Sequence, residues 1–268
     1  MTEQQDVIEE LDEAGVLSAI RWAYLSATAR LLATATDDTA FDDRGWVGYT
    51  RFKLFEDRLD RVFACERYSV GSGDRDVALD LLYSQLPKGE AGSMPRLEPG
   101  LVTRNNLNLS PGWAFGNKRF LLASAEFGKL RELPWPQKSP TKQKVASQVD
   151  PDPAQGALFD YPTDAELRDS GTLLSVETEL DMTTFVVGHS LDPLGGNIEL
   201  GFGRPRLNSG GGQAWLWLEN LLALPPSTGG QRADTSPQPT PADVEPDAPV
   251  RLRRQGGTLP GENRRSAQ

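Results

Sequence analysis

Apolar residues are distributed unevenly along this chain of 268 residues, which limits where a hydrophobic core can form. The last part, residues 225–268, has no aromatic side chain and is rich in Pro, Gly, Thr and Arg. Such a composition cannot bury enough apolar surface to offset the conformational entropy that ordering would cost. We therefore expect the folded part to end near residue 224 and residues 225–268 to form a disordered tail.

Charge and composition argue against several classes of protein. The formal net charge is -10, so the chain is too acidic to bind nucleic acid by general electrostatic attraction, although a local basic patch still could. The single cysteine, Cys65, cannot form an internal disulfide. No apolar run reaches the roughly 18 residues of a membrane span, and the N-terminus lacks the pattern of a secretion signal. These features predict a cytoplasmic protein with no membrane contact.

Apolar spacing predicts that the N-terminal third is helical. Apolar residues recur at intervals of three and four up to Gly15, again over 16–36, and again over 49–68. In the last of these segments Arg58, Asp60 and Arg61 fall on the polar face, which an amphipathic helix turns away from the core. A shorter helix is expected over 74–86.

Two segments farther along the chain have the pattern of β-hairpins. GWAFGNKRFLLASAEF places Gly116 and Asn117 between two short apolar runs, and TFVVGHSLDPLGGNIELGFG has two β-rich runs around residues 192–197. WLWLENLL, residues 215–222, has the pattern of a closing helix that ends before Pro225. Helices followed by hairpins and a last helix predict an α+β fold.

Composition also divides the chain into four parts. Residues 1–133 contain the helices and the first hairpin, and residues 165–224 contain the second hairpin and the closing helix, which we expect to pack on the first part. Between them, residues 134–164 have six prolines, several lysines and no apolar periodicity, which predicts a linker outside the fold. The tail over 225–268 is the fourth part, and its end is locally basic.

Few residues have the chemistry of a catalytic site. The chain has one histidine, His189, and the neighbouring Ser190 is a candidate nucleophile. Adjacent residues of a strand point to opposite faces, so these two side chains cannot form a base–nucleophile pair there. His189 is therefore the one candidate for acid–base catalysis, with a half-buried hairpin histidine as the simpler interpretation. The sequence does not indicate an enzyme.

Acidic clusters do not predict a metal site. The carboxylates at residues 37–43 lack the spacing of a calcium-binding loop, and a solvated turn between helices explains them more simply. Glu126 and Lys129 are similar to the Glu-x-Lys motif of metal-dependent nucleases but have one residue too many between them. We expect neither a metal ion nor a cofactor.

The most glycine-rich segment, GFGRPRLNSGGG, is a candidate phosphate-binding loop. The backbone amides of Gly210, Gly211 and Gly212 can contact a phosphate or an RNA backbone, together with the guanidinium groups of Arg204 and Arg206. The segment lacks the Gly-Lys-Ser/Thr ending of a nucleotide-binding P-loop. Its Gly-x-Gly-Arg start is similar to the glycine-rich loop of CRISPR RNA-processing endonucleases, over this segment alone. A flexible connector is the alternative.

A short motif, Gln155-Gly-Ala-Leu158-Phe159 followed by Asp160, interrupts the otherwise polar linker. It resembles the peptide by which bacterial polymerases, repair factors and some mobile-element proteins dock on the replicative sliding clamp. The resemblance implies that Gln155 binds a polar subsite while Leu158 and Phe159 fill an apolar pocket. Gly156 stands where the strongest form of the motif has leucine, so moderate affinity is expected.

Lys138, Lys142 and Lys144 precede this motif and add positive charge that favours nearby DNA. The sequence therefore predicts a non-catalytic accessory protein of bacterial DNA replication, repair or a mobile element, recruited to the sliding clamp. Two alternatives stay open. Leu158 and Phe159 can dock on the protein's own core instead, or the chain can bind nucleic acid or process RNA through its glycine- and arginine-rich loop.

Overall fold

The structure is a computed structural model that describes residues 2–35, 44–69, 82–148, 182–193 and 195–224. All of these belong to the first of two compact units, Met1–Arg232, and the second unit, Ala233–Gln268, lies outside the described residues. The predicted tail, the clamp-binding motif and most of the helix expected over 74–86 also lie outside them. The described part combines helices with a six-stranded sheet, which confirms the α+β class.

The predicted N-terminal periodicity is confirmed by three helices, α1 (Glu3–Glu13), α2 (Val16–Ala35) and α3 (Arg44–Val62). Gly15 separates α1 from α2 with a φ of 75°, a left-handed conformation that is accessible to glycine at little cost. Two shorter helices, η1 (Glu66–Tyr68) and α5 (Lys88–Ser93), follow α3. No helix in the described part is long and apolar enough to cross a membrane.

The sheet has its strands in chain order: β1 (Thr103–Arg104), β2 (Gly112–Phe115), β3 (Lys118–Ser124), β4 (Thr183–Leu191), β5 (Ile198–Pro205) and β6 (Trp215–Asn220). Neighbouring strands are antiparallel except β3 and β4, which are parallel, with Phe120 opposite Phe185. Both predicted hairpins, β2–β3 and β4–β5, are confirmed. The parallel pair joins the parts of the chain before and after the predicted linker in one sheet.

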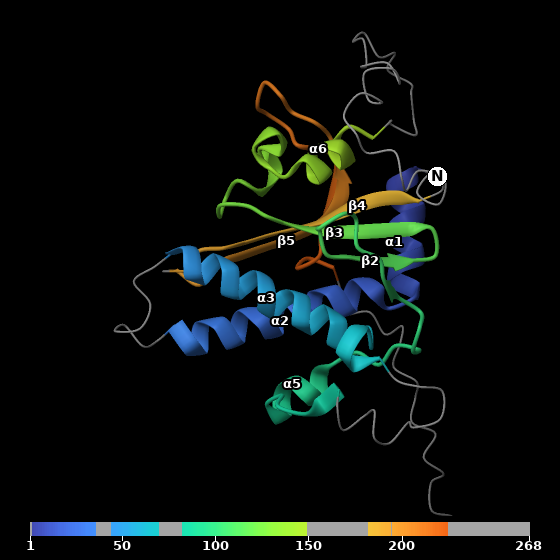
Figure 1. Cartoon of the computed structure of the whole chain (residues 1–268), viewed down its shortest axis with the longest axis vertical. Helices are drawn as coiled ribbons and strands as arrows, with labels where there is room; N and C mark the ends of the chain where they lie inside the picture. The colour runs from blue at the N-terminus through green and yellow to red at the C-terminus, as the bar shows by residue number, and fades with distance from the viewer. Residues whose placement is uncertain (1, 36–43, 70–81, 149–181, 194, 225–268) are drawn as a thin grey trace, which may run out of the picture. The chain divides into compact units, whose positions relative to one another are not determined.

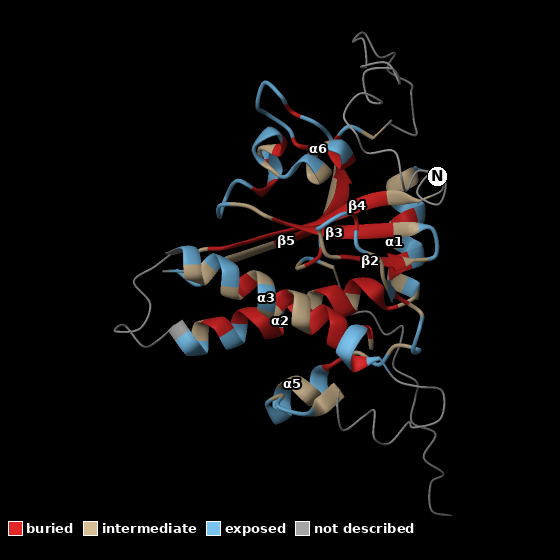
Figure 2. Ribbon diagram, viewed as in Figure 1, coloured by how far each residue is buried: buried red, intermediate tan, exposed pale blue. Residues whose placement is uncertain are grey.

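Both faces of the sheet are covered. Figure 1 shows α2 and α3 below the sheet and α6 (Pro140–Ala146) above it, and the short helices η2 (Leu130–Glu132) and η3 (Trp135–Gln137) pack in the upper layer with α6. Side chains alternate along each strand, so Phe120 and Leu122 of β3 pack with the N-terminal helices and Leu121 packs under α6. Buried residues follow the strands and the helix surfaces that face them (Figure 2).

The predicted closing helix over 215–222 is wrong, because Trp215–Asn220 forms strand β6. A β-bulge next to Arg204 places Trp215 on the sheet face that α6 covers and Trp217 on the face that the N-terminal helices cover. A sheet that is buried on both faces accepts an almost continuous apolar run as a strand. Periodicity alone does not distinguish such a strand from a buried helix.

The predicted linker is folded from Pro134 to Gln148, where it forms η3 and α6. Trp135 is fully buried against Trp215, with ring centroids 5.3 Å apart, and its indole Nε1 donates a hydrogen bond to the carbonyl oxygen of Ala214 (2.6 Å). α6 has seven residues, too few to show an apolar repeat, so its position depends on packing that the sequence pattern does not display.

The polar face of α3 is also buried, contrary to the prediction. Arg58 and Arg61 are only 6% and 3% exposed. The chain returns across this face, and Arg61 donates hydrogen bonds to the carbonyl oxygens of Leu82 (2.7 Å) and Ser84 (2.9 Å). An amphipathic repeat identifies the apolar face of a helix but carries no information on what covers the opposite face.

Candidate functional site

Charged residues of α3 form ion pairs and hydrogen bonds with the segments around this helix. We call this group the α3 charge network, and its members are Glu56, Asp57, Arg58, Asp60, Arg61, Arg67, Tyr68 and Arg104. Asp60 pairs with Arg104 and accepts a hydrogen bond from Trp113 Nε1 (2.9 Å). The Arg104 guanidinium also stacks over the Trp113 ring, 4.5 Å from its centroid.

The α3 charge network shifts the pKa values of its carboxylates in different directions. Burial raises the pKa of Asp60, and Arg104 only partly opposes that effect. For Asp57 burial acts in the same direction, but hydrogen bonds from Tyr68 (2.7 Å) and Arg67 outweigh it and lower the pKa. Both carboxylates, Asp60 buried and Asp57 partly buried, pair with arginines, which is the arrangement of a structural ion cluster. The density of acids and bases over residues 56–61, five of six positions, is the sequence signal that could have identified it.

His189 lies on β4 and is completely buried between the sheet and the N-terminal helices. Its ring contacts Phe55 and Tyr24, with centroids 5.2 and 5.7 Å away, and neither ring nitrogen has a hydrogen-bond partner among the described residues. Burial, followed by nearby cations, lowers the pKa of His189 well below its usual range. A neutral, fully enclosed imidazole cannot reach a substrate, so this position speaks against His189 as a catalytic acid or base.

The surroundings of His189 include two buried residues that the sequence did not single out. The Tyr24 hydroxyl donates a hydrogen bond to the carbonyl oxygen of Ser190, and burial raises the pKa of Tyr24 to about 12. Burial lowers the pKa of Arg51, whose Nε has no hydrogen-bond partner in the described part of the chain. The Ser190 hydroxyl points to the other sheet face and donates to Glu199 (2.5 Å), so strand alternation separates it from His189, as predicted.

The three lysines predicted to favour DNA differ in their exposure. Lys144 is exposed on α6, whereas Lys138 and Lys142 are partly buried, and we call these two the lysine pair. The Lys138 ammonium donates a hydrogen bond to the carbonyl oxygen of Ser124 (2.8 Å), at the end of β3. Burial lowers the pKa of Lys138, and burial together with the charge of Lys138 lowers the pKa of Lys142 to about 8.

Arg204 does not fit the predicted phosphate-binding loop. It lies on β5, is 6% exposed and forms an ion pair with Glu3 of α1. The other oxygen of the Glu3 carboxylate accepts a hydrogen bond from Trp217 Nε1 (3.0 Å). Glu3 therefore neutralises the guanidinium and ties α1 to β5 and β6, so Arg204 is not open to a phosphate.

The rest of the glycine-rich segment forms an exposed turn. Arg206 and Gly210–Gly212 are exposed, and the last two glycines have φ of 85° and 84°, a conformation that strongly favours glycine. The side-chain amide of Asn208 fixes the turn by donating to the carbonyl oxygen of Gly212 (3.0 Å). The glycine content is explained by this geometry, which agrees with the connector interpretation. Arg206 stays exposed beside the turn.

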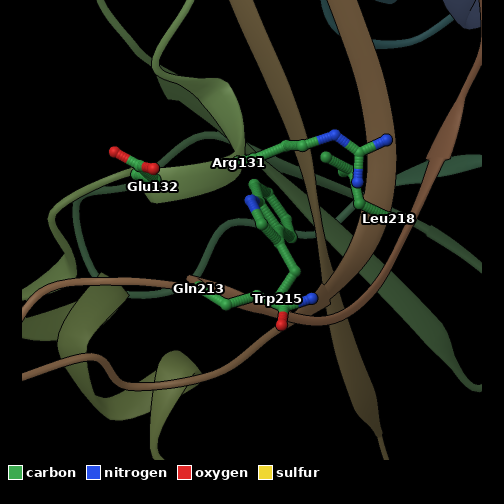
Figure 3. A pocket seen from close by; sticks show the side chains of 5 residues that line it. All are labelled: Arg131, Glu132, Gln213, Trp215 and Leu218. Carbon is green, nitrogen blue, oxygen red and sulfur yellow. The ribbon is translucent and has the colours of Figure 1, made fainter.

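Two surface hollows have different chemistry. The smaller has a volume of about 170 Å³ and is lined by Arg131, Glu132, Gln213, Trp215 and Leu218 (Figure 3). In Figure 3 the Arg131 side chain extends toward Leu218, whereas Glu132 points away. Typical sites for small molecules occupy roughly 300–1,000 Å³, so this hollow is too small for one. The larger, about 500 Å³, lies along α1 and includes the carboxylates of Glu9, Asp12 and Glu219, which disfavour phosphate.

Cys65 is buried, and burial, followed by the charge of Asp60, raises the pKa of its thiol to about 11. The reactive thiolate is therefore scarce at neutral pH. Within the described ranges, no group of three or more His, Cys, Asp or Glu side chains is placed to hold a metal ion. Glu126 and Lys129 form an exposed ion pair (3.7 Å), and the aspartates at 37–43 lie outside the described residues.

Two described residues close to the limits of segment 149–181, which carries the clamp-like motif, hydrogen-bond to each other. Gln148 Nε2 donates to the carbonyl oxygen of Thr184 (2.8 Å), and Gln148 Oε1 accepts from the Thr184 amide (3.0 Å). The chain therefore leaves and re-enters the described fold at one place. Because β3 and β4 pair directly, the predicted linker does not separate two independent domains.

No family model matches the chain, and no match was found among curated proteins or solved structures. The structure encloses His189 between the sheet and the N-terminal helices, ties Arg204 to α1, and leaves Arg206 and the glycine turn exposed.

Proposed function

We propose that this protein is a non-catalytic, cytoplasmic accessory factor of bacterial DNA replication, repair or a mobile element, recruited to the sliding clamp through Gln155, Leu158 and Phe159. The observation that carries the proposal is the spacing of these residues and the following Asp160 in a segment of otherwise polar character. An anionic protein gains access to DNA by this route because the clamp already encircles it.

The architecture of the described part supports this role. Gln148 and Thr184 hold the two ends of segment 149–181 together, so a partner bound to its middle would not need to separate strands of the sheet. Burying a leucine and a phenylalanine is worth about 3 to 5 kcal/mol before ordering costs, which is compatible with micromolar affinity. The burial of His189 and Cys65 supports a non-catalytic role.

Calorimetric titration of the purified chain with a bacterial sliding clamp tests the proposal. We expect micromolar binding by the wild type and a loss of at least about tenfold in the Gln155→Ala/Leu158→Ala/Phe159→Ala variant, because both apolar anchors are removed. A matched control changes Leu167 and Leu173 to alanine, in the same segment but outside the motif, and should bind like the wild type. Equal binding by the wild type and the triple variant would refute recruitment by this motif.

The alternative, docking of Leu158 and Phe159 on the protein's own core, predicts a different result. The triple variant would then unfold at a lower temperature than the wild type even without a clamp, because buried apolar contacts would be lost. Clamp recruitment predicts equal melting temperatures for these two proteins. Differential scanning calorimetry of the two chains alone separates the alternatives.

A further inference from the structure

Strand β6 lies at one edge of the sheet, and its outer side has no neighbouring strand among the described residues. The Leu221 amide donates to the carbonyl oxygen of Leu200 (3.1 Å), next to the paired residues Gly201 and Asn220. Alternate residues of an antiparallel strand direct their backbone groups to the same neighbour. The backbone amide and carbonyl of Leu218 therefore face away from β5, where they can pair with an added strand.

Strand β6 lacks most of the features that protect the edge of a sheet from further pairing. Proteins commonly block an edge with a very short strand, a lysine, a proline or a β-bulge. The opposite edge strand, β1, has only two residues, whereas β6 has six, of which four are apolar and none is lysine or proline. The β-bulge lies at the start of β6 and leaves Trp217–Asn220 in regular register. The second half of β6 is therefore an available edge.

The smaller surface hollow lies beside this edge, on the sheet face that α6 covers (Figure 3). Two hydrogen bonds tie η2 to the start of β6, from Trp215 Nε1 to the Leu130 carbonyl oxygen (2.8 Å) and from the Ala214 amide to the Arg131 carbonyl oxygen (3.0 Å). A cavity of about 150 Å³ holds one benzene molecule. The hollow, about 170 Å³, therefore accepts the one large apolar side chain that an added strand would place beside Leu218.

Arg131 gives this hollow a positive rim. Its side chain is exposed, extends toward Leu218 in Figure 3 and forms no ion pair among the described residues, while Glu132 points away. A carboxylate on an added strand would reach Arg131 from two residues beyond the apolar side chain, because alternate side chains share a face. If β6 of a second copy paired with β6 around Leu218, two Arg131 side chains would meet, which disfavours a symmetric dimer at this edge.

We propose that β6 binds an extended peptide of a partner protein as a seventh strand of the sheet, with one large apolar side chain in the hollow and a carboxylate two residues away at Arg131. Backbone hydrogen bonds to the edge supply affinity in this mode of recognition, and the hollow with Arg131 selects the sequence. The site lies within the described fold, does not include the clamp-like motif and does not depend on clamp recruitment.

Fluorescence anisotropy of a labelled heptapeptide, TEVFVET, tests the proposal with the full chain. Its side chains have the same order in both directions, so it serves for parallel and antiparallel addition, and its Glu and Phe side chains share one face. We expect saturable binding that weakens at least about tenfold when Ser replaces Phe, because the burial of the ring is lost. Failure of the peptide to bind, as expected if a second copy or another segment of this chain occupies the edge, would overturn the proposal.

Methylation of the peptide backbone distinguishes strand addition from a side-chain contact alone. Alternate amides of an added strand face β6, so either the Phe amide or the two Val amides pair with it. One probe carries an N-methyl group on Phe and the other carries one on each Val. We expect one of these probes to bind at least about tenfold more weakly and the other to stay within about threefold of the parent peptide. Equal binding of the two probes would overturn strand addition.

Charge reversal locates the peptide at the hollow. Arg131→Glu should weaken binding of TEVFVET about fivefold and strengthen binding of TKVFVKT, in which Lys replaces Glu, by a similar factor. Arg131 is exposed, so we expect this variant to keep the melting temperature of the wild type. The control Lys129→Glu, exposed in the same loop but outside the hollow, should change the binding of either peptide less than about twofold. Similar effects of the two variants would indicate diffuse attraction and refute a defined site.

Discussion

Two groups of buried charge in this protein are organised in opposite ways. In the α3 charge network, buried carboxylates face arginines from other segments, as Asp60 faces Arg104. Around β4, by contrast, His189 is fully buried and neither ring nitrogen has a hydrogen-bond partner among the described residues, and on the other face of the sheet no described carboxylate pairs with Lys138 or Lys142. A matched cluster makes the fold depend on each partner, whereas unmatched buried groups cost stability.

Removing a partner from the matched cluster should have the largest effect. Asp60→Ala removes one of the two carboxylates that pair with the partly buried Arg104, leaving only Glu56, and it leaves Trp113 Nε1 without its acceptor. We expect the free energy of unfolding to fall by about 3 kcal/mol, measured by urea denaturation. The control Glu126→Ala removes an exposed ion pair to Lys129 and should cost less than about 0.5 kcal/mol. Similar losses in the two variants would contradict the structural role of the network.

Acid should destabilise the folded protein through His189, which is buried in its neutral form. The folded-state pKa of His189 lies well below the unfolded value of about 6.5, so the unfolded chain binds more protons as the pH falls through 6.5. Stability attributable to neutral His189 is thus complete above pH 6.5 and declines below it, by up to about 2 kcal/mol at pH 5.

The variant His189→Leu isolates this contribution, because leucine fills a similar space and needs no hydrogen bond. We expect its stability to decline less between pH 7 and pH 5 than that of the wild type, by about the same 2 kcal/mol, in urea denaturation at each pH. Parallel pH profiles for the two proteins would show that His189 is not buried in its neutral form.

Neutralising a lysine of the pair should have the smallest effect, with the opposite sign to Asp60→Ala. Lys142→Met removes a partly buried charge that has no ion-pair partner among the described residues, and it should raise the free energy of unfolding at pH 7 by up to about 1 kcal/mol. The folded-state pKa of Lys142 is about 8, below the unfolded value, so wild-type stability should rise relative to the variant as the pH increases above 8. Lys144→Met, on the exposed face, should change neither quantity. A destabilised Lys142→Met protein would imply a missing counter-charge.

The regular elements were predictable where the signal is local. The helices before Val62 repeat apolar residues at helical spacing, and Gly116 with Asn117 forms a turn between short apolar runs. The helix predicted over 215–222 was wrong because an apolar run fits a strand and a buried helix equally well. Only the layers of helices that pack on both faces of the sheet decide between the two. The sequence did not predict α6 because this helix is short and Trp135 anchors it through contacts with Trp215, far away in the sequence.

The candidate site was predictable in part. Sequence spacing singled out Lys138 and Lys142 but could not separate them from Lys144, and it placed Arg204 in a phosphate-binding loop although Glu3 neutralises it. Tyr24 and Arg51 carry no motif and become relevant only because α2 and α3 bring them to His189. The clamp-like motif, in contrast, was found from the sequence alone, because the hypothesis of clamp binding depends only on residue spacing.

The sequence by itself determined the α+β class, the hairpins and the strand alternation that separates His189 from Ser190, because each follows from neighbouring residues. The tertiary structure decided which charges are matched. Glu3 meets Arg204 and Asp60 meets Arg104 only after distant segments pack together, and the lysine pair stays unmatched among the described residues for the same reason. The energy of a buried charge depends on its surroundings in space, and those are set by the fold.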